Sequence, residues 1–549
     1  MKGCSGRRAW IVGLVVYGLA SLSLHAQVNV STYHNDVARS GANTQETTLT
    51  PANVNSAQFG KWFSAAVDGQ VYAQPLYMSG VQIAGSARNV VYVATEHDSV
   101  YAIDAGNGVI YWHVSLIPPG GSATSAGNNN GSTVNCFLLT PEIGITGTPV
   151  IDPVAQILYV VAATSQNGVA TQTLHAVSLS SGQDVPNSPV VIQGSVAGAT
   201  RTVTFSAVAH LQRAALVLTG GQVIVAFGAH CDDLAWHGWL MAYNATTLQQ
   251  TAVFNSTPNG KEGGIWMSGA GPAIDSENRM FLSTGNGTFD DTTNTLPAVI
   301  PNNDFSESFL NINPATLTVQ DYYTPSQNAL WTSQDGDISA AGMTVLPDGI
   351  GPSGYPNLLV GDDKFGHIWL IDRDAMSGYA PNGDDTVQYL TLPLVSKCMA
   401  NDKHCVHSNP AYYNGTIYIG ESWYHVMAYP LTNGLIQANA QAVAVPSAMT
   451  TEEFNYPGPT PVISASPSGN GILWVLDNFT NGTDNGSHPL GPAVLHAYNA
   501  ANIGTELYNS SVKAADTGGN AAKFTIPVVA NGHVYVAGAG SLTVYGFAP

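Results

Sequence analysis

Four passages in the middle of the chain are rich in side chains that can bind ions, flat rings or charged ligands. Aspartate and asparagine oxygens suit calcium, an indole face can stack on a flat ring, and a lysine ammonium can pair with an anion. No serine-hydrolase elbow, phosphate-binding loop or zinc-protease helix accompanies them. The passages are HCDDLAWHGWLMAYNATT (230–247), EGGIWMSGAGPAIDSENRMFLSTGNGTFD (262–290), SQDGDISAAGMTVLP (333–347) and LLVGDDKFGHIWLIDRD (358–374).

A repeated strand pattern surrounds these passages and must position them. Each unit begins with a Pro-Val-like step, continues with two aliphatic and aromatic strands, and ends in a turn rich in Gly, Asn or Asp. Repeats of this kind, here roughly 65 residues apart, are typical of β-propellers. Eight units start at Gln74-Pro75-Leu76, Thr148-Pro149-Val150, Arg213-Ala214-Ala215, Gly271-Pro272-Ala273, Gly342-Met343-Thr344, Asn409-Pro410-Ala411, Thr460-Pro461-Val462 and Ile526-Pro527-Val528.

The two ends of the repeat predict how the ring closes. The last unit stops after its third strand, whereas an extra strand, GKWFSAAV at 60–67, precedes the first unit. We therefore expect an all-β fold, a single eight-bladed β-propeller of four-stranded antiparallel blades, in which the amino-terminal strand completes the last blade. The propeller would span 60–549, after a lead-in segment at 27–59. Its 57 Gly and 31 Pro and its 9% charged residues suit many turns between buried strands.

The amino terminus predicts export. Lys2, Arg7 and Arg8 precede an apolar run from Ala9 to Leu24, and a small-residue cleavage site follows before Gln27. This is typical of a signal peptide at 1–26; the alternative is an uncleaved membrane anchor. Cleavage would leave a periplasmic or extracellular protein without a membrane span. Losing three cations would move the formal charge from −20 to −23, which makes nucleic acid an unsuitable partner.

Four cysteines would remain after cleavage, and an even number in an exported chain favours disulfides. Three pairings are possible. The short polar loop between Cys398 and Cys405 favours that bond, with Cys136 bonded to Cys231. The alternative is a metal site at 398–407 that uses Cys398, His404, Cys405 and His407.

The four passages resemble, in order and spacing, the pyrroloquinoline quinone (PQQ) dependent alcohol dehydrogenases, although the chain would be a divergent member. The resemblance implies PQQ and calcium as cofactors. It places Asp233, before His237-Gly238-Trp239, at a calcium-binding acid of the family, with Asp232 as the alternative. It also implies that Asn286 is a second calcium ligand and that Trp266 forms the floor under the quinone.

The same resemblance assigns the catalytic base and a cation. Asp337 matches the family's catalytic aspartate best, and Asp335 is the competitor. Lys364 stands where a basic residue contacts the cofactor. PQQ is a flat quinone with three carboxylates, so an aromatic platform and a cation suit it. The base would remove the proton of the substrate hydroxyl.

The sequence also departs from the family pattern. The adjacent cysteine pair is missing, because the comparable region has only Asn135-Cys136, and Tyr72 stands where a glutamate contacts the cofactor. No convincing arginine matches the one that pairs with the quinone. Ser339, two residues after Asp337, argues against a lanthanide version. No haem attachment motif is present.

The lead-in contains YHNDVARSGANTQETTLTPANV at 33–54, which resembles the segment before the first propeller strand of quinoproteins. Its His34 and Arg39 either reach the funnel or pack in an edge loop.

Two functions therefore remain open. The first is an oxidoreductase that oxidises an alcohol or sugar with a calcium-bound quinone in the central funnel. The second is a non-catalytic propeller that binds a glycan, peptide or protein at the cell surface. The fold alone does not choose between them. The five matched residues favour the first function, whereas the missing cysteine pair and arginine favour the second.

Overall fold

The computed structural model describes residues 1, 3, 28–125, 139–232, 234–290, 303–394, 405–479 and 490–547. The predicted signal peptide lies almost entirely outside these ranges. Among the described residues, no helix has the length and apolar character needed to cross a bilayer.

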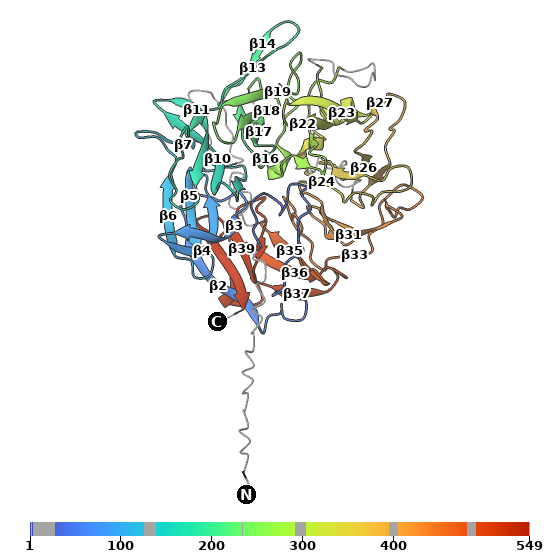
Figure 1. Ribbon diagram of the computed structural model, residues 1–549. Coiled ribbons are helices and arrows are strands. Elements are labelled where there is room, and N and C mark those ends of the chain that lie inside the picture. Colours follow the sequence, from blue (N-terminus) through green and yellow to red (C-terminus); the bar gives the residue numbers. More distant parts are fainter. Residues whose placement is uncertain are drawn as a thin grey trace.

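Eight sheets are arranged around a centre, as Figure 1 shows, and each contains a four-stranded antiparallel unit. The predicted eight-bladed β-propeller is therefore confirmed. Blades 1 to 4 consist of β3 (Leu76–Ile83), β4 (Ser86–Ala94), β5 (Ser99–Asp104) and β6 (Ile110–Ser115); β9 (Val150–Asp152), β10 (Ile157–Gln166), β11 (Val169–Ser178) and β12 (Val190–Val191); β16 (Val217–Thr219), β17 (Gln222–Ala229), β18 (Trp239–Asn244) and β19 (Gln250–Asn255); β20 (Ala273–Ile274), β21 (Met280–Ser283), β22 (Phe309–Asn313) and β23 (Thr318–Thr324).

Blades 5 to 8 repeat this order, and the last blade takes its fourth strand from the amino-terminal part of the chain. They consist of β24 (Met343–Val345), β25 (Leu358–Asp362), β26 (His367–Asp372) and β28 (Gln388–Thr391); β29 (Ala411–Tyr413), β30 (Thr416–Gly420), β31 (Val426–Thr432) and β33 (Ala448–Met449); β34 (Val462–Ser466), β35 (Gly469–Asp477), β36 (Val494–Asn499) and β37 (Glu506–Asn509); β38 (Val528–Ala530), β39 (His533–Gly538), β40 (Ser541–Phe547) and β2 (Phe59–Ala66).

Short additional elements decorate these blades. β13 and β14 form a two-stranded ribbon that projects from the ring at the top of Figure 1. The others extend a blade or connect its strands. The additional elements are β1 (Ala42–Asn43), β7 (Ser122–Ser125), β8 (Glu142–Ile143), β13 (Ser195–Ala197), β14 (Thr202–Thr204), β15 (His210–Leu211), β27 (Gly378–Tyr379), β32 (Leu435–Ile436), α1 (Asn328–Gln334) and the 3-10 turns Met267–Gly269, Ile338–Ala340 and Ala514–Asp516.

The second strands of the blades carry most of the core. In β10 the residues from Leu158 to Ala163 are all buried, and β17 is buried from Val223 to Gly228. Both runs are rich in β-branched and aromatic residues, which fit a pleated strand covered on both faces. Burial of consecutive residues therefore explains why these strands lack a polar–apolar alternation.

The ring closes through β2, which pairs antiparallel with β40 from Phe59 opposite Phe547 to Ala66 opposite Ser541. In Figure 1 the blue β2 accordingly lies beside the red carboxy-terminal strands. Closure removes the free edges that an open sheet would expose. The strand expected at 60–67 thus joins the last blade.

The lead-in segment runs through the centre of the ring and contacts every blade. First strands of neighbouring blades touch one another there, as β3 and β38 do. The bonds, one per blade in order, are Val30 N to Tyr77 O (2.8 Å), Ile151 N to Ser31 O (2.8 Å), Arg39 Nη2 to Leu216 O (3.4 Å), Ile274 N to Val37 O (2.7 Å), Val345 N to Ala38 O (3.0 Å), Tyr412 N to Ser40 O (2.8 Å), Ile463 N to Gly41 O (2.7 Å) and Asn43 Nδ2 to Val529 O (2.9 Å).

His34 and Arg39 belong to this central segment and are almost fully buried. Arg39 donates to the carbonyl oxygens of Pro272 at 3.0 Å and Tyr33 at 2.9 Å. His34 Nε2 lies 2.9 Å from Pro461 O. Of the two possibilities left by the sequence, the structure therefore favours packing, although at the centre of the ring and not in an edge loop.

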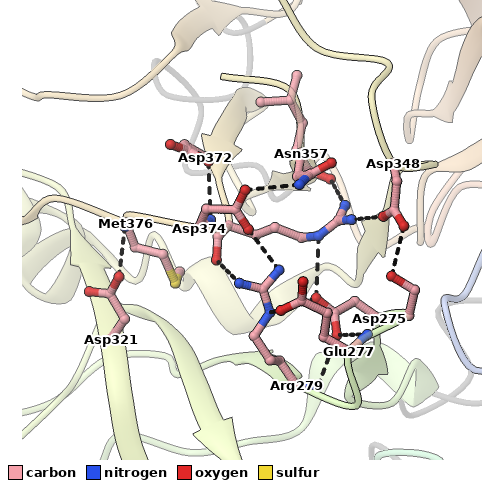
Figure 2. A network of polar contacts seen from close by, with 12 residues as sticks. Asp275, Glu277, Arg279, Asp321, Asp348, Asn357, Asp372, Asp374 and Met376 are labelled. Carbon is pink, nitrogen blue, oxygen red and sulfur yellow. Dashed lines mark hydrogen bonds and ion pairs between the residues drawn. The ribbon is translucent and has the colours of Figure 1, made fainter. Parts of the chain in front are cut away.

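An ionic network joins blades 4 and 5 (Figure 2). Arg279 donates from Nε to Asp275 at 2.7 Å and from Nη2 to Asp374 at 2.8 Å. The buried Arg373 contacts Asp348 and lies 3.4 Å from Asp275. Because these groups come from turns of two neighbouring blades, the network ties the blades together.

Cys231 and Cys405 each take part in a disulfide bond. The other two cysteines of the predicted mature chain, Cys136 and Cys398, lie outside the described residues, so the pairing stays a prediction. A bonded Cys405 has no thiolate to offer a metal, which counts against the alternative metal site at 398–407.

Candidate functional site

A cavity of about 330 Å³ lies where loops of several blades meet. Four of the five residues singled out by the sequence line it: Trp266, Asn286, Asp337 and Lys364. Both alternatives, Asp232 and Asp335, line it as well. The fifth residue, Asp233, lies outside the described residues. Small-molecule sites in proteins usually measure about 300–1,000 Å³, so the cavity suits a small ligand.

Asp337 is held by two contacts that use both of its carboxylate oxygens. Oδ1 accepts a hydrogen bond from the backbone N–H of Asn286 at 2.8 Å, and Oδ2 lies 3.0 Å from Lys364 Nζ. Gly285 permits this approach, since a Cβ there would lie 2.3 Å from Asp337 Oδ1. The glycine-rich turn after β21 therefore fits against the polar stretch after α1.

Asp335 makes a parallel pair of contacts from a more open position. Its Oδ1 accepts from Asn286 Nδ2 at 2.7 Å, and its Oδ2 lies 2.7 Å from Lys364 Nζ. The Asp335 side chain is 51% exposed, against 8% for Asp337. Asp335 ends α1 with φ 59°, in the left-handed region that aspartate tolerates. Of the two carboxylates, Asp335 is therefore the more accessible to a ligand.

Lys364 lies between these carboxylates and is 6.0 Å from the centroid of the Trp266 ring. Burial alone would lower the pKa of Lys364, but the charges of Asp337 and Asp335 outweigh it and raise that pKa above its ordinary value. Lys364 therefore stays a cation throughout the physiological pH range.

Trp266 is positioned by contacts on two sides. Its backbone N–H donates to Ser339 Oγ at 3.2 Å. A Cβ at Gly228 would lie 2.8 Å from Trp266 Cβ, so the glycine in β17 makes room for the tryptophan. The indole is thus fixed beside the Asp335–Asp337–Lys364 cluster.

Two further acids adjoin this cluster. Glu307, which sequence analysis missed, is fully buried and accepts from the backbone N–H of Ile338 at 2.9 Å. Burial, followed by the charge of Asp337, raises the pKa of Glu307 well above its ordinary value. Desolvation by the surrounding cavity also raises the pKa of Asp232 to about 6, although this residue remains exposed, and the charges of Asp337 and Asp335 add to the effect.

The remaining wall of the cavity is basic and aromatic. Arg213, Lys523, Phe524, Tyr456 and His407 line it. Arg213 Cζ lies 4.3 Å from the centroid of the Phe524 ring, and Lys523 Nζ lies 5.9 Å from the same centroid. Sequence analysis missed this wall because Arg213 opens blade 3 and Lys523 precedes blade 8, far apart in the chain.

The sequence matches no protein-family model and no curated protein, but the fold matches solved structures. The quinohemoprotein alcohol dehydrogenase of Comamonas testosteroni matches with a TM-score of 0.62 and 14% identity, over 94% of this chain and 80% of that one. The quinohemoprotein alcohol dehydrogenase ADHIIG of Pseudomonas putida HK5 matches with a TM-score of 0.57 and 14% identity, over 95% of this chain and 80% of that one. A europium-containing methanol dehydrogenase matches with a TM-score of 0.55 and 12% identity, over 95% of this chain and 99% of that one.

The chain thus shares its fold with two quinohemoprotein alcohol dehydrogenases and a methanol dehydrogenase. The resemblance found in the sequence is thus confirmed for the fold. At 12–14% sequence identity, a shared fold does not show a shared chemistry, so the chemistry has to be argued from the cavity.

The cavity suits a flat anionic ring better than it suits a calcium ion. Trp266 and the cations Arg213, Lys364 and Lys523 match an aromatic polycarboxylate. For calcium, Asn286 Oδ1 is a buried oxygen without a partner, but Asp335 and Asp337 already contact Lys364. In the described part of the chain, no group of three His, Cys, Asp or Glu side chains is arranged for a metal. The described residues therefore do not complete the predicted calcium site.

Proposed function

We propose that this chain is an exported PQQ-type oxidoreductase that oxidises an alcohol or sugar. The observation that supports the proposal is the convergence of Trp266, Asn286, Asp337 and Lys364 on one cavity, from loops of three blades. When bound, the quinone would supply the electron-accepting chemistry, and the protein would position it.

Trp266 and Lys364 would hold the cofactor in this proposal. The indole face gives a platform for a flat ring, and the ammonium of Lys364 lies 6.0 Å from that ring's centroid. A carboxylate of the quinone would pair with Lys364 at the edge of the platform. Burial of Lys364 strengthens that attraction, because few water molecules screen it.

The pair Asp335 and Asp337 would take the proton of the substrate hydroxyl. Of the two, exposure favours Asp335 as the acceptor, because its side chain is 51% exposed, whereas that of Asp337 is only 8% exposed. Asp337 would then hold Lys364 and the Asn286 turn in position. A general base must come within hydrogen-bond reach of the proton that it removes.

The proposal is tested by titrating purified protein with PQQ and following quinone absorbance and tryptophan fluorescence. Dye reduction is then measured with a panel of alcohols and aldoses. We expect saturable binding, and we expect Asp335→Asn to abolish dye reduction while PQQ remains bound. Asp337→Asn is the matched variant, which should weaken PQQ binding as well. Absence of binding at high micromolar quinone would end the oxidoreductase proposal and leave the cell-surface binding module, which retention on washed cells would test.

A further inference from the structure

Arg213 is a buried guanidinium that faces the cavity without an acidic partner. Its residue is 6% exposed, and its Nε is buried with no hydrogen-bond partner. Within the described ranges, no hydrogen bond or ion pair involves Arg213; its recorded close contact is with the ring of Phe524, 4.3 Å away. An arginine has five N–H donors in a fixed fork, and leaving even one of them buried without a partner is costly. Such a side chain is poised to bind an anion.

A second cation reinforces the same wall. Lys523 is 2% exposed, lines the cavity, and has its Nζ 5.9 Å from the ring that Arg213 contacts. An anion that lies beside both cations would be attracted by each of them. The ring itself attracts both cations through its face, which fixes where they point.

Glu96, the acid that acts on Arg213, forms no ion pair with it. Glu96 influences Arg213 electrostatically, but its Oε2 accepts hydrogen bonds from Gly144 N at 2.7 Å and Thr146 Oγ1 at 3.0 Å. Burial raises the pKa of Glu96 to about 7, so near neutral pH a large share of it is uncharged. The guanidinium therefore lacks the full negative charge that a buried cation needs.

The scarcity of cations in this chain makes the arrangement more telling. The full sequence has 16 Lys and Arg against 36 Asp and Glu, and three of the 16, Arg213, Lys364 and Lys523, line this one cavity. Asp335 and Asp337 contact Lys364, so Arg213 and Lys523 are the cations of the cavity that lie apart from this cluster.

We propose that Arg213 and Lys523 form a carboxylate-binding subsite for a ring-bearing ligand, in the cavity that they share with the Asp335–Asp337–Lys364 cluster. Arginine binds a carboxylate in a planar, two-pronged geometry, and Phe524, Tyr456 and Trp236 supply apolar surface for a ring. The proposal deepens the proposed function and rests on its small-molecule cavity, but not on the quinone. The carboxylate comes either from the bound quinone or from the substrate.

The experiment compares two probes of the same shape on protein without added ligand. Benzene-1,3-dicarboxylate carries two charges, and benzene-1,3-dicarboxamide carries none. Binding is followed by calorimetry and by quenching of tryptophan fluorescence, since Trp236 and Trp266 line the cavity. We expect the dicarboxylate to bind at least tenfold more tightly than the diamide, with a preference that falls as salt is added.

Variants separate the subsite from general charge effects. Arg213→Gln should remove the tenfold preference, Arg213→Lys should keep part of it, and Lys523→Gln should reduce it less. Arg201→Gln is the matched control, because Arg201 is exposed and its loss changes the net charge equally; it should bind like the wild type. Thermal melts check that each variant is folded. Equal binding of the two probes by the wild type, or equal effects of Arg213→Gln and Arg201→Gln, would overturn the subsite.

Competition with PQQ distinguishes the two sources of the carboxylate. If PQQ-loaded protein no longer binds the dicarboxylate, the quinone's carboxylate occupies the subsite. If loaded protein still binds it with the Arg213-dependent preference, the substrate carries the carboxylate. If PQQ does not bind at all, the oxidoreductase proposal fails while the ligand-free titration still decides the subsite.

Discussion

Two regions of this propeller contain buried arginine side chains, and they differ in the partners that the fold supplies to them. Between blades 4 and 5, Arg279 lies 2.7 Å from Asp275 and 2.8 Å from Asp374 (Figure 2). Arg373, in the same network, contacts Asp348 and donates to Leu346 O at 2.8 Å. In the cavity, Arg213 is buried to a similar degree and contacts the face of Phe524. The first region gives its arginines carboxylate partners within the fold, whereas Arg213 forms no ion pair with the described residues.

The difference separates residues that stabilise the fold from residues that await a ligand. A buried charge with its partners supplied by the chain holds two blades together. A buried charge without them lowers the stability of the ligand-free protein, and binding then repays this loss. Proteins commonly give up stability at functional sites in this way. The comparison predicts opposite signs for removing the two kinds of arginine.

The largest effect is expected for Arg373→Met. Asp275, which is buried in the neighbouring blade, and Asp348, which lies in the same blade, lose the cation that Arg373 provides. Removing one partner of a buried ion pair costs about 3–5 kcal/mol. Guanidinium denaturation should show a loss of that size in the free energy of unfolding, and Arg373→Lys should restore part of it. A loss below about 1 kcal/mol would mean that this network is as weak as an exposed one.

Arg213→Met should act in the opposite direction. Replacing buried charged groups by apolar ones is often neutral or stabilising by about 1–4 kcal/mol. The thermal midpoint of the ligand-free variant should therefore equal or exceed that of the wild type, while binding of the dicarboxylate probe is lost. Destabilisation as large as that of Arg373→Met would show that Arg213 serves the fold, and the comparison would fail.

The same comparison extends to acids, and Glu421 provides a pH test. Glu421 is fully buried after β30, and neither of its oxygens has a partner among the described residues. Burial raises the pKa of Glu421 from 4.5 to about 8. Between these pH values the folded protein keeps a proton that the unfolded chain has released, so wild-type stability falls as pH rises through this window.

Glu421→Gln cannot titrate and should escape this loss. Melting midpoints at pH 5, 6, 7 and 8 should show the variant gaining on the wild type as pH rises. Glu452→Gln is the control, because Glu452 is exposed, and its difference from the wild type should stay flat. If the difference in melting midpoint between Glu421→Gln and the wild type also stays constant with pH, Glu421 does not have a raised pKa in the folded protein.

The sequence was sufficient to predict the fold, but it predicted the residues of only one wall of the cavity. The Pro-Val-like steps repeat at each blade, and seven of the eight predicted starts coincide with a first strand; in blade 3, β16 begins at Val217, just after the predicted Ala215. Trp266, Asn286, Asp337 and Lys364 lie in the middle passages, whose motifs were visible. Arg213 and Lys523 had no such signal, because their proximity depends on ring closure and neither lies in a motif. Glu307 was missed because only its burial sets it apart from other glutamates, and the sequence does not show burial.

The smallest effect is expected for an exposed lysine–carboxylate pair, Lys261 and Glu262. Lys261 Nζ lies 2.7 Å from Glu262 Oε1, a distance equal to that between Lys364 and Asp335, but the Lys261 side chain is 72% exposed and that of Lys364 is 8% exposed. Exposed pairs contribute about 0–1 kcal/mol because water and salt screen them. A double-mutant cycle on Lys261→Gln and Glu262→Gln should give a coupling below about 0.5 kcal/mol. A coupling as large as that at Arg373 would show that burial does not set the strength of these contacts, and the contrast between Arg373 and Arg213 would then need another cause.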